Sequence, residues 1–270
     1  MLKIKATGGM VSSKGSKRRD RIQRVVEEQG AVSVGALAEM LDVSMQTIRR
    51  DLDVLCDGDV LRRTHGRIEL SPDRLNSPLE ERKGTNRAGK RSIAELVATM
   101  IPDGSTLFLS IGSTPLAVAK ALAHRQELTV ITNNLGAAMA LSDEVSNRIL
   151  LPGGELRLPD RDFIGEESVD FFTRFRAEYA VFGVAGVAAD GGLLDFHPAE
   201  VRSRIQMQRN AQTAILVLDQ SKFGRIAAAH GGNISDADRV VIDRPPTGKY
   251  QGLLDPLEDR VTYSEALDVI

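Results

Sequence analysis

Apolar residues recur at helical spacing in three short stretches near the start of the chain. Such spacing predicts three short amphipathic helices, the first from about residue 17 to 29 and ended by Gly30. Ser33 and Ser44 precede the second and third stretches, where a hydroxyl caps a helix N-terminus well. The apolar positions of the three stretches are Ile22, Val25 and Val26; Val34, Leu37, Ala38 and Leu41; and Ile48, Leu52 and Leu55.

The segment VLRRTHGRIEL follows, with Gly66 between two short extended runs, and predicts a β-hairpin. Three helices and a hairpin form a winged helix-turn-helix, which inserts the start of its third helix into the DNA major groove. Gln there reads adenine, and Arg reads guanine or holds a phosphate. The expected DNA contacts are Ser44, Gln46, Thr47, Arg49, Arg50, Arg62, Arg63, His65 and Arg67. Asp51 and Asp53 are expected to pair with these arginines. The alternative is a solvated helix face, and the spacing favours DNA binding over it.

From about residue 105 the pattern changes to buried strands that alternate with helices. This alternation predicts a parallel, doubly wound α/β sheet with helices on both faces. Two prolines and the lack of an apolar period predict a linker just before it. The expected organisation is a disordered basic tail over 1–16, the winged unit over 17–70, the linker over 71–86, the α/β domain over 87–250 and a C-terminal segment over 251–270.

Ligands of such sheets bind at the carboxyl ends of the strands. One of these ends, the segment SIGSTP that begins at Ser110, runs directly into a predicted helix. Its hydroxyls and the helix N-terminus suit a phosphate ester. The alternative is that Thr114 is only a helix cap and Gly112 only a turn. The loop by itself does not decide between the two.

Two neighbouring strand ends carry polar groups that suit a hydroxylated ligand. Asn133 and Asn134 close one strand, and Gly153, Gly154 and Glu155 close the next. Turn formation is the alternative, because Asn and Gly populate turns in any case. For the glycines the turn is the slightly better explanation.

Lys222 follows a further buried strand, which ends at Asp219. It could meet a phosphate held by the first loop, although a surface position is the more common state of a lysine. Asp195, His197 and Glu200 cluster in LLDFHPAEV, where an acid–base role is conceivable. No catalytic signature fixes such a role.

Composition limits the class of protein further. The chain has 270 residues, of which 42% are hydrophobic, and suits one large or two modest domains. No apolar run approaches the roughly 20 residues of a membrane span, and the basic, polar N-terminus does not resemble a secretory signal. Cys56 is the single cysteine, and no Cys/His cluster has zinc spacing. We therefore expect a soluble cytoplasmic protein without metal or other cofactor.

The formal net charge of -2 is distributed unevenly. Residues 1–70 hold 13 Lys or Arg against 10 Asp or Glu, so they carry +3 and the other 200 residues carry -5. A basic terminal unit on an acidic body suggests a polyanionic partner for the first part only. Because basic ends are common, the asymmetry supports DNA binding only together with the helical pattern.

Both halves of the chain resemble the DeoR-type bacterial transcriptional regulators. The first half matches through VSMQTIRRDL and LRRTHG, and the second through IGSTP, VITNN, PGGEL, GVAGV and DQSKFGR. The ordered combination of these segments is specific, and it covers nearly everything from Lys17 to Pro246.

The resemblance implies a ligand-gated repressor, not an enzyme. Such regulators bind operator DNA through the winged unit, and a phosphorylated sugar or polyol usually releases them. Their C-terminal domains resemble the ribose-5-phosphate isomerase and CoA-transferase type of fold. The segments STLFLSIGSTPLAVAKAL, FIGEESVDFFTRFRAEY and SKFGR look closest to a subgroup that senses sn-glycerol 3-phosphate. A homodimer or homotetramer is expected. Two alternatives stay open: a sugar-phosphate isomerase with a DNA-binding appendage, and a regulator that senses a different sugar phosphate.

The resemblance also changes the interpretation of single residues. It makes Lys222 an effector contact, and the expected effector-binding set is Ser110, Gly112, Ser113, Thr114, Asn133, Gly153, Gly154, Glu155, Glu200 and Lys222. Two positions depart from the family pattern. Ser110 stands where the family usually has an aspartate, so it cannot supply a carboxylate to a polyol hydroxyl. HGR replaces the usual HGG, so Arg67 either adds a phosphate contact or alters the turn of the wing.

Overall fold

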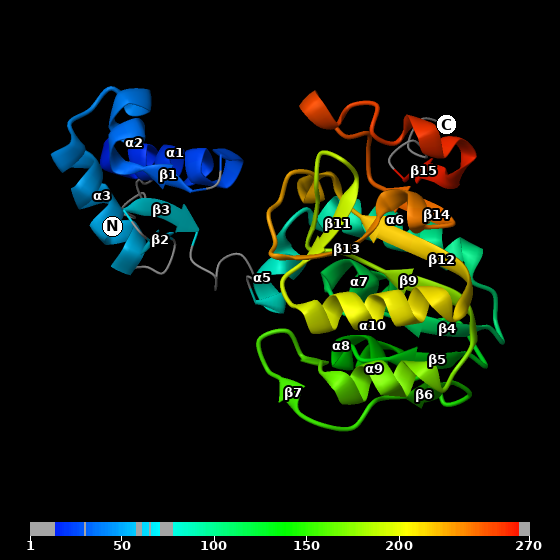
Figure 1. Ribbon diagram of the computed structural model, residues 1–270. Coiled ribbons are helices and arrows are strands. Elements are labelled where there is room, and N and C mark those ends of the chain that lie inside the picture. The colour runs from blue at the N-terminus through cyan, green and yellow to red at the C-terminus, as the bar shows by residue number, and fades with distance from the viewer. Residues whose placement is uncertain (1–13, 30, 58–60, 65, 71–77, 265–270) are drawn as a thin grey trace, which may run out of the picture. The chain divides into compact units, whose positions relative to one another are not determined.

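The computed structural model describes residues 14–29, 31–57, 61–64, 66–70 and 78–264. The chain divides into two compact units, Met1–Leu75 and Asn76–Ile270 (Figure 1). Each unit has a hydrophobic core of its own. Most of the predicted disordered tail lies outside the described residues. Residues 14–16 belong to the first helix, so the tail prediction is wrong for them.

The first unit is a winged helix-turn-helix, as the sequence predicts. Ser33 caps the second helix by accepting from the Ala36 N–H at 3.1 Å, and Ser44 caps the third by accepting from the Thr47 N–H at 3.2 Å. The short strand β1 is not predicted, and it extends the hairpin to three strands in the order β1-β3-β2. The elements are α1 Lys14–Gln29, β1 Val32–Ser33, α2 Val34–Leu41, α3 Met45–Asp57, β2 Leu61–Thr64 and β3 Arg67–Leu70.

The second unit is built on a seven-stranded sheet with the order β15-β14-β12-β9-β4-β5-β6. All neighbouring strands of this sheet are parallel. The chain builds outward from β4 through β5 to β6, and then from β9 in the opposite direction. The carboxyl ends of β4 and β9 therefore form the switch point at which doubly wound sheets bind ligands. The strands are β4 Thr106–Leu109, β5 Thr129–Thr132, β6 Arg148–Leu150, β9 Ala177–Phe182, β12 Ala211–Leu218, β14 Arg239–Ile242 and β15 Val261–Tyr263.

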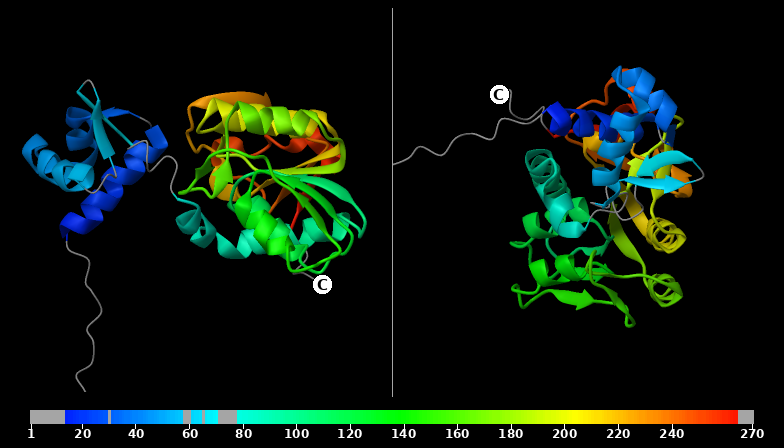
Figure 2. Two further views of the ribbon diagram at one scale, coloured as in Figure 1. Left: turned by 90° about the horizontal axis from the view of Figure 1, so that it is seen from below. Right: turned by 90° about the vertical axis from the view of Figure 1, so that its left-hand side faces the viewer.

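Helices cover both faces of the sheet, as the views in Figure 2 show. Side chains of β4 alternate between the faces, so that Leu107 and Leu109 join one core while Phe108 joins another. The first core also contains residues of α6, α7 and α8, and the second contains residues of α9 and α10. The helices are α6 Arg87–Met100, α7 Ser113–Ala121, α8 Leu135–Leu141, α9 Glu166–Thr173 and α10 Pro198–Arg209. None of the helices described is long and apolar enough to cross a membrane.

Two domain boundaries differ from the prediction. The predicted linker 71–86 contains the helix α5 Leu79–Gly84, whose Leu79 is buried within the second unit. The predicted C-terminal segment 251–270 contributes β15, which pairs with β14 at one edge of the sheet. Both elements are short and lack a clear apolar period, which is why the pattern alone does not reveal them.

Short strands and turns that the sequence does not predict surround the end of the sheet where the switch point lies. They include a hairpin of β7 Leu156–Arg157 and β8 Asp162–Phe163, and a sheet of β10 Gly186–Val187, β11 Gly192–Asp195 and β13 Ala229–Asn233. Four 3-10 helices complete the described part of the unit: η1 Gln220–Lys222, η2 Ile234–Asp236, η3 Gly248–Tyr250 and η4 Asp255–Arg260.

Candidate functional site

The third helix of the winged unit presents a polar, basic surface. Ile48 and Leu52 are completely buried on its inner face, whereas Gln46, Arg49 and Arg50 are exposed on the outer face. Within the described residues, the guanidinium groups of Arg49 and Arg50 form no hydrogen bond or ion pair. Two exposed cations on a helix of this kind suit an anionic partner.

The wing is fixed to this helix and to the neighbouring strand. The Arg63 guanidinium donates to the carboxylate of Asp53 at 2.6 Å, as expected, and Arg62 pairs with Glu69 at 2.6 Å. Arg67 donates to the carbonyl of Ala31 at 2.5 Å. The side chains of Arg62 and Arg63 are half exposed, which leaves part of each guanidinium accessible to a phosphate.

The structure differs from the predicted DNA surface at Asp51 and agrees with it at the turn of the wing. Asp51 does not pair with the arginines of its own helix: it is buried and pairs with Arg18 of α1, so the expectation for it is wrong. The turn of the wing uses Gly66, whose φ is 77°, while Arg67 is already in β3. The HGR sequence is therefore compatible with the turn. His65 lies outside the described residues.

A cavity lies at the switch point of the second unit. The loop after β4 supplies Gly112 and Ser113, the loop after β9 supplies Gly183 and Val184, and η1 supplies Lys222. The sequence predicts three of these positions. A smaller cavity lined by Ser110 and Asn133 shares several residues with the first: Ile111, Gly183, Asp195 and Glu200.

One end of the larger cavity is cationic. Gly112 adopts φ 114° and opens helix α7, whose first N–H groups have no partner within the helix and favour an anion. The side chains of Ser113 and Thr114 are buried beside this helix end. Lys222, Arg225 and Arg82 line the same cavity. Backbone N–H groups, hydroxyls and three cations together are suited to a phosphate group.

The crowding of these cations affects the protonation of Lys222. Burial lowers the pKa of Lys222 to about 7, and the positive charge of Arg225 contributes in the same direction. Asp219, which precedes Lys222 in the chain, opposes this lowering of the lysine pKa. A dianion that entered the cavity would stabilise the charged form of Lys222 and relieve the repulsion among the cations.

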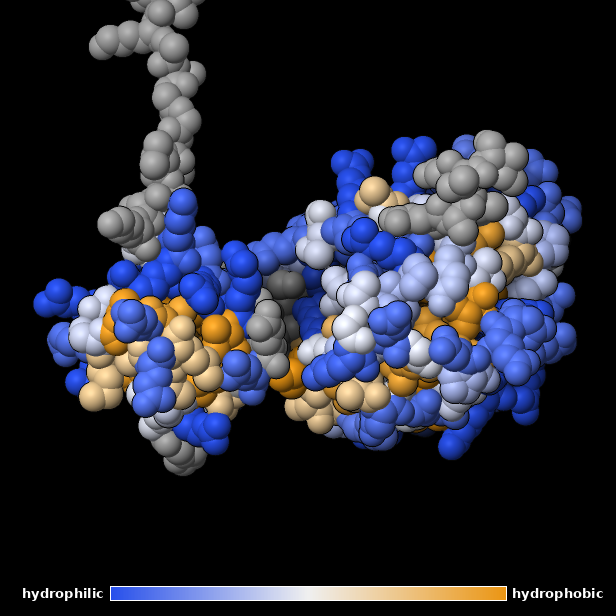
Figure 3. Space-filling model, turned by 90° about the horizontal axis from the view of Figure 1, so that it is seen from above, coloured by the Kyte–Doolittle hydropathy of each residue, from blue (hydrophilic) through white to orange (hydrophobic). Residues whose placement is uncertain are grey.

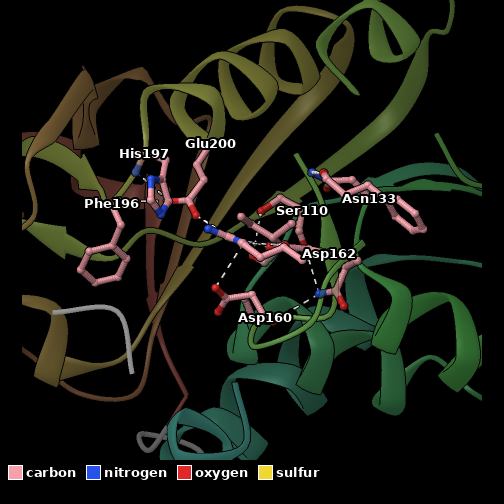
Figure 4. A network of polar contacts seen from close by, with 12 residues as sticks. Ser110, Asn133, Asp160, Asp162, Phe196, His197 and Glu200 are labelled. Carbon is pink, nitrogen blue, oxygen red and sulfur yellow. Dashed lines mark hydrogen bonds and ion pairs between the residues drawn. The ribbon is translucent and has the colours of Figure 1, made fainter. Parts of the chain in front are cut away.

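The other end of the cavity is organised around Arg157. Its guanidinium donates to Asp162 at 2.9 and 2.7 Å and to Glu200 at 2.7 Å, and it lies 3.3 Å from Asp160. Figure 4 shows Asp160, Asp162 and Glu200 directed toward a common centre from different elements. The Nη1 atom of Arg157 is buried and has no hydrogen-bond partner within the described residues. This end therefore offers carboxylate acceptors and one unused donor.

The smaller cavity adds two polar groups of different kinds. Asn133 is buried, and its Nδ2 donates to the carbonyl of Phe163 at 2.9 Å, while its Oδ1 has no partner within the part of the chain described. The Ser110 hydroxyl donates to the carbonyl of Ile111 at 3.1 Å. Ser110 is thus buried beside the cavity without supplying a charge.

The structure does not bring every predicted effector residue to the cavities. Gly153, Gly154 and Glu155 are exposed and line neither cavity, so the cavities give their role in effector binding no support. Conversely, the prediction omitted Arg82, Arg157, Asp162 and Arg225. For Arg157 and Asp162 the sequence gives one signal, the dense charges of the segment RLPDRD that follows Gly153 and Gly154.

Comparison with known proteins agrees with both halves of this description. Residues 18–73 match the model of the DeoR-like helix-turn-helix domain, and residues 85–244 match that of the DeoR C-terminal sensor domain. The chain is 43% identical to the glycerol-3-phosphate regulon repressor of Escherichia coli (strain K12) over 233 residues, which cover 86% of this chain and 92% of that relative. It is 40% identical to the repressor of the same name from Haemophilus influenzae over 235 residues, which cover 87% and 92%.

Solved structures are less similar. Ribose 5-phosphate isomerase A from Methanocaldococcus jannaschii is 18% identical, with a TM-score of 0.38 and coverage of 52% of this chain and 55% of that one. A match at this level carries no argument about the fold or the chemistry. The family models and the close relatives are decisive instead: the chain belongs to the DeoR family and is a DNA-binding transcriptional repressor with a C-terminal sensor domain.

Proposed function

We propose that this repressor acts in the cytoplasm on genes that handle glycerol phosphates, and that sn-glycerol 3-phosphate releases it from its operator. The observation that supports the effector most directly is the polarity of the cavity at the switch point. Its cationic end lies at the N-terminus of α7, with Lys222 and Arg225, and its other end carries Arg157 with Asp162 and Glu200.

The two ends suit the two parts of a phosphorylated polyol. A phosphate dianion is satisfied by backbone N–H groups and by the charged groups of Lys222 and Arg225. The two free hydroxyls of glycerol 3-phosphate each need an acceptor and a donor. The carboxylates of Asp162 and Glu200 accept, the unused Nη1 of Arg157 donates, and the Oδ1 of Asn133 is a further acceptor. These groups replace the aspartate that Ser110 does not provide.

The recognition helix and the wing are the proposed operator contacts. Gln46, Arg49 and Arg50 are exposed at or near the start of α3, the part that enters the major groove in this class of domain. Arg62 and Arg63 lie on the wing strand β2, and their proposed partner is the phosphate backbone. Because these contacts are largely ionic, operator affinity is expected to fall steeply with salt.

The alternative of an isomerase needs a general base, for which Asp195 and Glu200 are the candidates. Asp195 accepts from Arg204 at 3.0 Å and from the Ala185 N–H at 3.3 Å, so both of its oxygens are engaged. Glu200 accepts from Arg157 and from the Phe196 and His197 N–H groups, which makes it part of the start of α10. Both carboxylates therefore have structural roles, which favours a sensor over a catalyst.

We further propose that the repressor is a homodimer or homotetramer, since a winged unit reads repeated half-sites best from a symmetric assembly. Hydrophilic and hydrophobic side chains are mixed on the face shown in Figure 3. Three large apolar side chains of the second unit are strongly exposed: Met139, Val145 and Leu158. Sedimentation velocity of the full chain across a concentration series tests this proposal, and a monomer at all concentrations contradicts it.

The effector proposal is tested by thermal unfolding of the full chain with a panel of phosphate esters. The panel contains sn-glycerol 3-phosphate, its enantiomer sn-glycerol 1-phosphate, ribose 5-phosphate, fructose 1-phosphate and inorganic phosphate. A ligand that binds only the folded state raises Tm by mass action. We expect the largest rise with sn-glycerol 3-phosphate, which also weakens binding to an operator selected from random DNA duplexes. A larger rise with another ester would replace the effector but keep the repressor, whereas turnover of ribose 5-phosphate would favour the isomerase.

A further inference from the structure

The helix α5 is the first element of the second unit, so the chain that leaves the DNA-binding unit enters the sensor unit here. Its start is attached to the loop between β7 and β8. The Leu79 N–H donates to the carbonyl of Pro159 at 3.0 Å, and Glu80 pairs with Arg161 at 3.2 Å. The helix has only six residues, so an exchange of partners at one of its side chains can reorient the whole helix.

Arg82 projects from α5 into the effector cavity. It lines that cavity together with Ser113, Lys222 and Arg225. Its guanidinium donates to the carboxylate of Asp160, and both side chains are largely buried. Arg82 is therefore a cavity residue carried by the same short helix that follows the DNA-binding unit.

The other end of α5 is tied to the turn that carries Lys222. Lys90 is buried, and its Nζ donates to the carbonyl of Arg82 at 2.8 Å and to that of Thr85. The same Nζ lies 3.6 Å from the carboxylate of Asp219, whose other oxygen accepts from the Ser221 N–H beside Lys222. The position of α5 and the position of the cationic end of the cavity are thus linked through buried polar groups.

We propose that Arg82 is a ligand of the effector phosphate and the residue through which effector binding lowers operator affinity. This inference rests on the proposed function. A phosphate dianion carries more charge than the carboxylate of Asp160 and binds a guanidinium through two oxygens, so it draws Arg82 away from Asp160. Because Arg82 is fixed to α5, the exchange of partners moves the helix at which the DNA-binding unit is attached. By linkage, the operator weakens effector binding by the same factor.

The comparison of two glutamine variants tests this role in the full-length protein. Arg82→Gln and Arg225→Gln each remove one cation from the cavity, but only Arg82 belongs to α5. Effector affinity is measured by calorimetry with sn-glycerol 3-phosphate. Operator affinity is measured by fluorescence anisotropy, without effector and at an effector concentration that saturates each variant.

We expect both variants to bind the effector more weakly than the wild type. In the wild type, saturating effector should raise the operator Kd by about tenfold or more, in the range usual for coupled sites. The coupling ratio is the operator Kd at saturating effector divided by the operator Kd without effector. Arg225→Gln should keep the wild-type ratio, whereas in Arg82→Gln the ratio should fall toward one. If saturated Arg82→Gln shows the wild-type ratio, the proposed role of Arg82 is wrong.

Asp160→Asn decides the case in which Arg82→Gln binds no effector at all. Loss of the carboxylate removes the partner that competes with phosphate for Arg82. Effector affinity should then rise, and operator affinity without effector should fall by a similar factor. An unchanged operator affinity in Asp160→Asn would overturn the coupling role. If sn-glycerol 3-phosphate fails to release even the wild type, the proposed effector is wrong, and the same variants are compared with the ester that raises Tm most.

Discussion

Asn134 donates hydrogen bonds from its side-chain amide to the carbonyl oxygens of Gly112 at 3.3 Å and of Ser110 at 3.2 Å. Its Oδ1 accepts from the Ala137 N–H at 3.1 Å and so caps α8. The side chain is almost completely buried between the ends of β4 and β5. One amide therefore holds the candidate phosphate loop and starts the next helix.

Asn134→Asp separates these two roles. A carboxylate still caps α8, but it cannot donate to the two carbonyls and it repels them. We expect the free energy of unfolding to fall by about 1–3 kcal/mol, as for a buried polar group that loses its partners. Effector affinity should also fall, because the amide of Asn134 no longer holds the loop after β4. Urea unfolding and calorimetry measure the two effects.

Asn147→Asp is the matched control. Its Nδ2 also donates to a carbonyl, that of Leu141 at 3.3 Å, and its Oδ1 accepts from the Leu128 N–H. Asn147 does not line either cavity. We expect Asn147→Asp to lower the free energy of unfolding, but the folded variant should bind the effector with the wild-type affinity. Equal effector affinities for wild type and Asn134→Asp would show that the loop does not need this support.

The sequence predicts those parts of the site that depend on regular alternation. Strands and helices alternate strongly enough to place the loop at Gly112 and the turn at Lys222 at carboxyl ends of parallel strands, and such ends share one edge of a sheet. The alternation of strands and helices along the sequence does not reveal the order of the strands in the sheet. That β4 and β9 are neighbours, and that their ends form the switch point, requires the three-dimensional pairing.

The residues that the sequence analysis missed come from segments without periodicity. Arg82 lies in a short helix within the predicted linker, and Arg157 and Asp162 lie in two-residue strands. An arginine in an irregular segment has the same sequence signature whether it is solvated or, like Arg157, surrounded by three carboxylates. Only tertiary contacts distinguish the two.

If Lys222 binds the effector phosphate as proposed, effector binding depends on pH. Its pKa is lowered to about 7, chiefly by burial and then by Arg225, so above pH 7 the free protein loses the charge that we propose to hold the phosphate. Effector affinity should therefore fall by up to about tenfold per pH unit between pH 7 and 9. Below about pH 6 it should fall again, because the phosphate becomes a monoanion. Calorimetry at a series of pH values measures this profile.

Lys222→Arg provides the control for the alkaline side. An arginine stays charged over the whole range, so this variant should lack the decline above pH 7 even if its affinity at pH 7 is lower. A wild-type affinity that is constant from pH 7 to 9 would place Lys222 outside the phosphate site.

Arg50→Ala tests the DNA surface. Arg50 is exposed on α3, and its guanidinium forms no hydrogen bond or ion pair within the described residues, so thermal stability should not change. Operator affinity should fall by about 1–3 kcal/mol if Arg50 reads a base, and about equally for all DNA sequences if it holds a phosphate. Fluorescence anisotropy with operator and with unrelated duplexes distinguishes these outcomes.

Arg91→Ala is the matched control for charge. Among the described residues of the sensor unit, Arg91 is the most exposed arginine that forms an ion pair, and its partner is Glu95 on the same helix. Arg91→Ala removes the same charge as Arg50→Ala. Salt screens charges that are remote from the DNA, so operator affinity should stay within about twofold of the wild type. An equal loss of affinity in both variants would mean that Arg50 acts only through net charge.

Gly89→Ala tests the packing between α6 and the turn near Lys222. In most helices this change stabilises by about 1 kcal/mol. Here a Cβ would lie 2.6 Å from Asp243 Oδ2 and 2.7 Å from Asn86 Nδ2, two atoms that are themselves hydrogen-bonded at 2.7 Å. Asp243 is completely buried and also accepts from the Gln220 N–H at 2.8 Å, so it cannot move aside freely.

We therefore expect Gly89→Ala to lower the free energy of unfolding by about 1–3 kcal/mol, as overpacking of a well-packed site does. Gly84→Ala is the control, because a Cβ at this last residue of α5 meets no atom within 4 Å and should leave stability equal or slightly higher. Urea unfolding of both variants gives the comparison. A Gly89→Ala protein as stable as Gly84→Ala would show that the Asn86–Asp243 contact yields without cost, and that α6 is held to the sensor turn mainly through Lys90.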